Sequence, residues 1–139
     1  MILQLISACL FLAVAVISFI MALKGLSVRQ FLPFHANSAG VQWDSLDRRL
    51  QAVIISMVRI NGYAFLIVSI QLIIGLIGNF FLANRLLQSV SASMAFVFCL
   101  GLFLSNYRLH LQTNAKTPWK GSLFAALALA IGLILSMSL

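Results

Sequence analysis

Few side chains in this sequence can bind or transform a ligand, and none of them forms a standard catalytic pattern. There is no glycine-rich phosphate loop, no paired-cysteine or HExxH metal motif and no nucleophile elbow. Cys9 and Cys99 lie inside apolar stretches, where a cysteine usually behaves as a small hydrophobic residue. We therefore predict no catalytic residue, no metal ligand and no cofactor, and we expect any binding to involve cations, amides and histidines.

Arg59 is the most informative of the cations, because no acid lies near it along the chain. The only acids, Asp44 and Asp47, precede it by at least twelve residues, or roughly 18 Å along a helix. An arginine at the edge of an apolar stretch needs an anion, and we expect a lipid phosphate, with a substrate or partner carboxylate as the alternative. Asp44 has the spacing for a helical ion pair with Arg48.

Two histidines and two amides complete the set of candidate binding residues. His35 and His110 both flank apolar stretches, but their spacing does not bring them together, so interfacial hydrogen bonds are expected before haem or metal ligation. Gln71 lies near the middle of an apolar stretch and Asn61 near its start. Such amides usually bond to a neighbouring helix, and substrate contact is the alternative.

Composition identifies the elements that must position these residues. The chain has 139 residues, of which 63% are hydrophobic and only 8% charged, so a soluble domain is excluded. Four apolar stretches, at about residues 2–23, 52–78, 86–104 and 120–139, are each long enough to cross a bilayer. We predict an all-α polytopic membrane protein, a single domain over 1–139 built as an antiparallel bundle of four transmembrane helices. The first stretch lacks the basic start and cleavage site of a signal peptide.

The basic residues predict how this bundle is oriented. Cytoplasmic connections are enriched in lysine and arginine, so the first and third connections are expected inside and both termini outside, in a cell inner membrane. Five cations follow the first apolar stretch, three follow the third and one follows the second, namely Lys24, Arg29, Arg48, Arg49 and Arg59, then Arg108, Lys116 and Lys120, then Arg85 alone.

The net charge of +7 does not indicate nucleic acid, because the cations flank apolar helices and no aromatic-basic binding face accompanies them. They are expected to meet anionic lipid headgroups, at about 1 kcal/mol per charge near the surface. Trp43, Tyr107 and Trp119, the last beside Lys120, form the aromatic belt expected at the same interface.

Small residues and turn signals predict how the helices pack and where they end. Small side chains recur at helical spacing in three of the stretches and predict close helix contacts. Asp44 or Ser45 is expected to cap an amphipathic start of the second helix, residues 79–84 to form a tight outer turn, and Thr117 before Pro118 to cap the last helix. The packing residues are Ala8, Ala15, Ser18 and Ala22 in the first stretch, Ser91, Ala95 and Cys99 in the third, and Ala128, Gly132 and Ser136 in the fourth.

The long connection over residues 24–43 is the best loop in which to look for function. Phe31, Leu32 and Phe34 surround Pro33 and are too apolar for a solvated loop, so we expect them to dock under the inner ends of the helices. The sequence HANSAG at 35–40 is small and polar enough to turn or to contact a ligand.

Three fragments carry a resemblance to known proteins. FLPFHANSAG followed by WDSLDRRLQ, and TNAKTPW before the last span, resemble small uncharacterised bacterial inner-membrane proteins with four spans, which implies the layout and no activity. The topology is also similar to the membrane-associated glutathione and eicosanoid enzymes, and Arg59 and Asn61 occupy part of their pattern. The acidic residue and the arginine-rich repeat of those enzymes are absent here, which argues against glutathione chemistry.

The favoured function is an accessory, assembly or scaffold subunit that binds lipid or partner membrane proteins. An oligomeric small channel or transporter, or a lipid-facing membrane enzyme, is the alternative, whereas a proton-coupled exporter would need a carboxylate in the first span. Expected partners are anionic lipid headgroups and a partner membrane protein or a second copy of the chain, and not nucleic acid. The candidate binding residues are Arg59, Asn61, Gln71, His35, Trp43, Arg48, His110, Trp119 and Lys120.

Overall fold

The computed structural model describes residues 2–137, apart from the side chain of Phe34. Within this range every regular element is a helix, and α1, α3, α4 and α5 are each long and apolar enough to cross a membrane. This confirms the predicted all-α class with four long apolar helices. In chain order the elements are α1 (Ile2–Leu26), α2 (Pro33–Ala39), the short 3-10 helix η1 (Trp43–Ser45), α3 (Arg48–Leu82), α4 (Arg85–Thr113) and α5 (Trp119–Met137).

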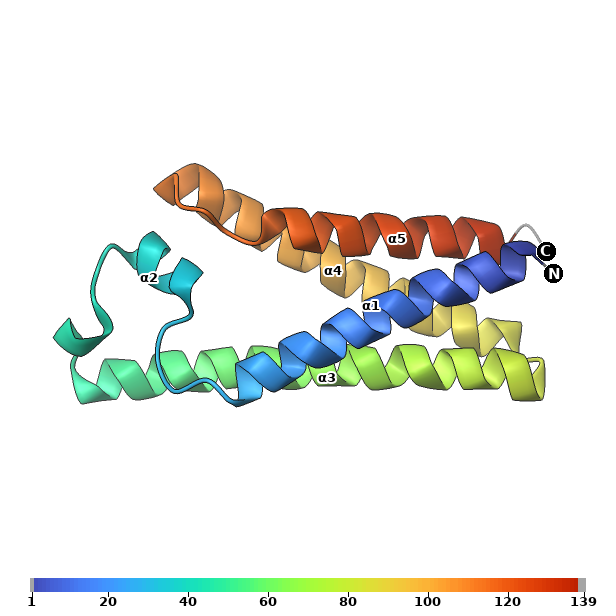
Figure 1. The fold of residues 1–139 in the computed structure, drawn as a ribbon, viewed down its shortest axis with the longest axis horizontal. Helices are drawn as coiled ribbons and strands as arrows, with labels where there is room; N and C mark the ends of the chain where they lie inside the picture. Colours follow the sequence, from blue (N-terminus) through green and yellow to red (C-terminus); the bar gives the residue numbers. More distant parts are fainter. Residues whose placement is uncertain (1, 138–139) are drawn as a thin grey trace.

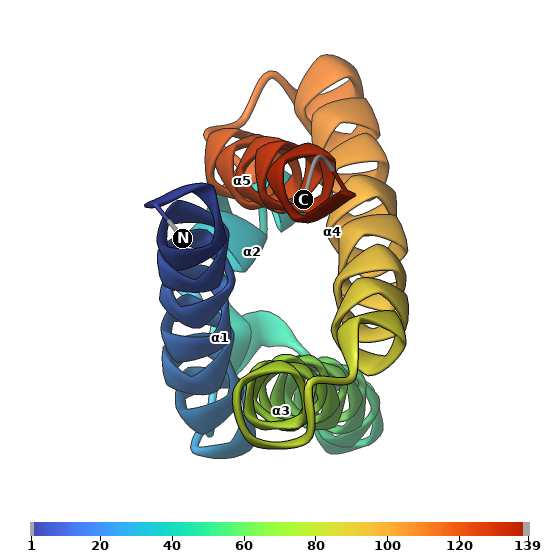
Figure 2. The same cartoon turned by 90° about the vertical axis from the view of Figure 1, so that its right-hand side faces the viewer.

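The four long helices run antiparallel and form a ring when viewed along the bundle (Figures 1 and 2). Helix α1 begins beside α5 and ends beside α3, while α4 begins beside α3 and ends beside α5. Both helices start at the same end of the bundle, and they are tilted in opposite senses. The start of α1 and the end of α5 therefore lie at one end, called here the terminal end. Helix α2 lies at the opposite end, called here the loop end (Figure 1).

Small residues bring the helices together as the sequence predicted. The stripe of α1 and that of α4 are buried in full, and in α5 Gly132 is buried while Ala128 and Ser136 are half-buried. Larger side chains, including Phe11, Leu72 and Leu129, fill the centre between these stripes. Dispersion contacts and close backbone approach are the main attraction between helices in lipid, so these stripes explain the bundle.

Glycines mark the closest helix contacts. A Cβ added to Gly62 of α3 would lie 2.9 Å from the backbone nitrogen of Leu26 at the end of α1. A Cβ added to Gly132 of α5 would lie 2.5 Å from a ring carbon of Phe11 in α1. Helix α1 is thus fixed to α3 at the loop end and to α5 further along the bundle.

The start of α3 differs from the prediction. Asp47 is the N-cap, and its side chain accepts a hydrogen bond of 2.8 Å from the backbone N–H of Leu50. Asp44 and Ser45 lie in η1 instead, so neither of them caps α3. The predicted helical ion pair of Asp44 with Arg48 is wrong as well. Asp44 lies in η1 and Arg48 in α3, and the backbone between them is extended at Leu46 and Asp47, so the two residues do not share a helix.

The connection from α3 to α4 is shorter than predicted. Helix α3 continues to Leu82, and only Ala83 and Asn84 form the turn. Ala83 has a left-handed backbone with φ of 50°, and the Asn84 side chain accepts from the backbone N–H of Leu87 at 3.0 Å. The predicted turn over residues 79–84 is therefore wrong, and Asn79 stays inside the helix and is buried in the bundle.

The other end of α4 also departs from the sequence expectation. The helix continues to Thr113, so His110 lies in its last turn and not beyond it. The Thr117 hydroxyl donates to the carbonyl of Asn106 at 2.9 Å and holds the connection against α4. This bond takes the place of the predicted helix cap.

The long first connection folds at the loop end, where α2 contacts α4 (Figure 1). Pro33 opens α2, a position that suits proline because its missing N–H is not needed there. Most of the HANSAG segment is therefore helical rather than a turn, and Gly40, with φ of 65°, ends the helix. Phe31 and Leu32 are half-buried as predicted, whereas the side chain of Phe34 lies outside the described part of the structure.

Candidate functional site

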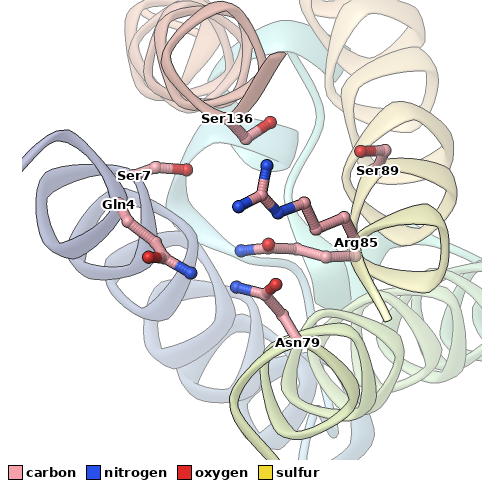
Figure 3. A pocket seen from close by; sticks show the side chains of 7 residues that line it. Gln4, Ser7, Asn79, Arg85, Ser89 and Ser136 are labelled. Atoms are coloured by element: carbon pink, nitrogen blue, oxygen red, sulfur yellow. The ribbon is translucent and has the colours of Figure 1, made fainter. Parts of the chain in front are cut away.

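A small polar pocket lies at the terminal end, in the space enclosed by the four long helices (Figure 3). Each of these helices contributes to it, and every lining residue is polar. The lining consists of Gln4 and Ser7 from α1, Asn79 from α3, Arg85, Gln88 and Ser89 from α4, and Ser136 from α5. We call it the terminal pocket.

Close packing of α3 against α4 assembles one wall of the terminal pocket. A Cβ added to Gly75 would lie 2.9 Å from the Cβ of Ser91, so a larger residue at this position would push the helices apart. The Gln71 side chain donates to the carbonyl of Ser91 at 3.3 Å, which confirms the predicted interhelical bond. Gly75 also faces Gln88, whose Cα would lie 3.2 Å from the added Cβ, and Asn79 lies one helical turn further along α3 and lines the same pocket.

The polar groups of the terminal pocket differ in how well they are satisfied. The Ser7 hydroxyl donates to the carbonyl of Gly132 at 2.9 Å, and the Ser136 hydroxyl donates to that of Leu133 at 2.8 Å. Asn79 and Gln88 are only 6% and 5% exposed, yet no hydrogen bond within residues 2–137 engages either side-chain amide. Both residues line the cavity, so their amide groups are free to bond to a ligand or water there.

Arg85 gives the terminal pocket its charge. Its guanidinium points into the space between the helices, as do the side chains of Gln4 and Asn79 (Figure 3). The cavity has a volume of about 10 Å³, which is room for roughly one water molecule. Two of the long helices begin and two end here, so their dipoles largely cancel, and Arg85 is the one charged side chain in the lining.

No acidic side chain of the protein can neutralise Arg85. The only two acids in the sequence, Asp44 and Asp47, precede α3. The 35 residues of α3 place them roughly 50 Å from the terminal end. The terminal pocket therefore combines one cation with several unpaired amide groups.

Sequence reasoning missed this pocket. Arg85 counted only as the single cation outside the loop end, and none of the lining residues was a candidate. One signal was present, because Gln4 and Ser7, like Arg85 and Gln88, are polar residues three positions apart at the ends of apolar stretches that meet at one end of the bundle. Because Asn79 was assigned to a turn, the contribution of α3 to this polar cluster was not predicted.

The second candidate site is an open groove on α3 at the loop end, and we call it the α3 groove. The lining residues recur three and four positions apart on α3 alone, and they are Ala52, Ile55, Ser56, Arg59, Ile60 and Tyr63. Gly25 near the end of α1 faces both Val58 and Gly62 of α3, so Arg59 lies close to the level at which α1 ends. Arg59 is exposed and forms no ion pair within the part of the chain that the structure describes.

The remaining predicted residues form two further groups at the loop end. Around Trp119, the ring of Tyr107 lies 5.5 Å away, that of His110 6.2 Å away and the Lys120 ammonium 5.6 Å from the ring centre. His110 Nδ1 lies 2.7 Å from the carbonyl oxygen of Ala115, which is the kind of interfacial hydrogen bond that the sequence predicted.

His35 and Trp43 form the other group, through Phe31. The Phe31 ring lies 5.1 Å from Trp43, edge to face, and 6.4 Å from His35. Burial lowers the pKa of the His35 imidazole, because the charged form loses its hydration. Asn61 and Arg48 are exposed on α3 and line neither the terminal pocket nor the α3 groove.

Comparison with known proteins finds no matching protein family, no matching curated protein and no matching solved structure. The resemblances suggested by the loop fragments thus gain no support from these comparisons. The function of the chain is therefore inferred from the terminal pocket and the α3 groove.

Proposed function

We propose that this chain is a multi-pass protein of a bacterial inner membrane, where it acts as a non-catalytic accessory or scaffold subunit that binds anionic phospholipid and partner membrane proteins. The four apolar helices support the membrane assignment. The eight basic residues that belong to the loop end support a cytoplasmic position for that end, with both termini outside.

The α3 groove carries this proposal. The Arg59 guanidinium can bind a lipid phosphate, and the hydroxyls of Ser56 and Tyr63 can form hydrogen bonds with headgroup oxygens. Ile55 and Ile60 give the same surface apolar walls that suit the start of an acyl chain. A phospholipid headgroup satisfies the charge of Arg59 and also covers the apolar part of the groove.

The exposed start of α3 supports the scaffold role. Residues 48–57 precede the contacts that Val58 and Gly62 make with Gly25 of α1, and they include Leu50, Val53 and Met57, of which Met57 is 64% exposed. Contiguous apolar surface of this kind usually marks a contact with a membrane or another protein. A partner helix that lies along this segment would bury it.

Native mass spectrometry of the purified protein tests the lipid assignment. Wild type should carry more anionic than zwitterionic lipid, Arg59→Ala should lose this preference, and Arg59→Lys should keep part of it because a lipid phosphate needs only a reachable cation. Arg49→Ala removes an equally exposed cation of the same helix and should behave as wild type. Anionic lipid bound equally well by Arg59→Ala would refute the α3 groove as its site. If a protein copurifies with wild type but with neither Arg59 variant, the ligand of Arg59 is a carboxylate of that partner, held by two hydrogen bonds, and not a lipid phosphate.

An oligomeric small channel, transporter or lipid-facing enzyme is the second candidate function. The observation in its favour is the terminal pocket, which is polar and surrounded by all four long helices. A stable homo-oligomer with a bound small molecule in the same mass spectra would favour it over the subunit role. Copurification of a larger complex of different chains would favour the subunit role.

A further inference from the structure

The terminal pocket offers more hydrogen-bond donors and positive charge than the protein can satisfy. A guanidinium has five N–H donors and a side-chain amide has two, and amides can rotate to direct either end into a cavity. The hydroxyl protons of Ser7 and Ser136 are already used by backbone carbonyls. The unused donors therefore belong to Arg85, to the buried amides of Asn79 and Gln88, and to the side chains of Gln4 and Ser89.

We propose that the terminal pocket binds one small monovalent inorganic anion, about the size of chloride. Arg85 supplies the charge, and Asn79 and Gln88 direct their N–H groups toward the anion. A water molecule could satisfy the amides but would not neutralise the guanidinium, and no side-chain carboxylate of residues 2–137 lies at this end. An anion satisfies both requirements.

The dimensions of the terminal pocket define which anions fit. A cavity of about 10 Å³ is far too small for gluconate or for a sugar phosphate, and a monoatomic anion, which is slightly larger than water, would lie at its open side next to Arg85. Arg85 is itself exposed, so an anion can reach it from solution at the terminal end. This site is separate from the α3 groove, and neither site depends on the other.

Thermal unfolding of the full chain in zwitterionic nanodiscs tests the proposal with bromide as the probe. Sodium bromide should raise the Tm and the rise should saturate, because a ligand that binds only the folded state stabilises it. Sodium gluconate at the same ionic strength should leave the Tm unchanged. Equal responses to the two salts, or no response to either, would overturn the proposal.

Two charge-matched variants locate the bromide site. Arg85→Gln should weaken bromide binding at least about tenfold, because it removes the charge-assisted bonds. Arg49→Gln removes the same charge from the opposite end and should leave the bromide affinity unchanged. Equal affinity in Arg85→Gln and wild type would overturn the assignment.

Gln88→Glu keeps the test decisive even where Arg85→Gln does not fold. It places a carboxylate one helical turn from Arg85, where it takes the role of the anion. We expect this variant to be more stable than wild type in gluconate and to show no bromide response. A bromide response as large as that of wild type would show that the anion binds elsewhere.

Discussion

Arg59 and Arg85 are the two cations whose surroundings suggest binding, and the sequence pointed to only one of them. Arg59 could be identified because the only two acids precede it by at least twelve residues, which the sequence itself shows. The surroundings of Arg85 include Asn79 and Gln88, which line one pocket from two helices that are joined by only Ala83 and Asn84. A site built across helices depends on the turn geometry, which local propensities do not determine.

His35 should make the docking of the α2 segment sensitive to pH. Burial lowers the pKa of His35 from its usual 6.5, so the folded state binds fewer protons than the unfolded state. The stability from its neutral form is present above pH 6.5 and is lost as the pH falls through the folded-state pKa. Limited proteolysis of residues 29–43 should therefore be faster at pH 5.5 than at pH 7.5.

His35→Gln provides the control for this titration, since it should remove most of the pH dependence. His110 is the other histidine at the loop end, on the helix that α2 contacts, and His110→Gln should retain the dependence on pH. Cleavage rates that do not change with pH in wild type would contradict the prediction.

The helices themselves were easier to predict than their ends. Apolar stretches and small-residue stripes report lipid exposure and close packing directly, which is why the α1 and α4 stripes are found buried. Helix ends depend on competition between nearby caps. Asp47 caps α3 although Asp44 and Ser45 are also suitable residue types, and Thr117 bonds to Asn106 although it precedes a proline.

The contact between α1 and α3 should tolerate no side chain at Gly62. In Gly62→Ala the new Cβ would meet backbone atoms of α1 at 2.9 Å, so the helices must separate, at a cost of about 1–3 kcal/mol. Gly101→Ala is the matched control, because nothing lies within 4 Å of its added Cβ. Thermal unfolding in detergent should show a lower Tm for Gly62→Ala alone. Equal Tm values for the two variants would refute this close contact.

The whole molecule has a strong charge asymmetry between its two ends, and this asymmetry predicts its orientation in the membrane. In a variant whose native cysteines are replaced by serine, Ala115→Cys should react with an impermeant maleimide only after cells are permeabilised. Asn84→Cys, in the turn at the terminal end, should react in intact cells. The reverse pattern would contradict both the orientation and the cytoplasmic position of the α3 groove.

The two-residue turn between α3 and α4 determines what the surroundings can recognise on each side of the protein. At the loop end, the described connections cover residues 27–47 and 114–118, enough for an antibody, a protease or a docking protein to grip. Between α3 and α4 at the terminal end, only Ala83 and Asn84 separate the helices, and such a tight link offers a macromolecule almost no epitope. What this link leaves accessible is the opening beside Arg85, whose dimensions suit a dissolved ion. The described connections of the loop end thus suit contacts with macromolecules, whereas the turn between α3 and α4 suits access by a dissolved ion.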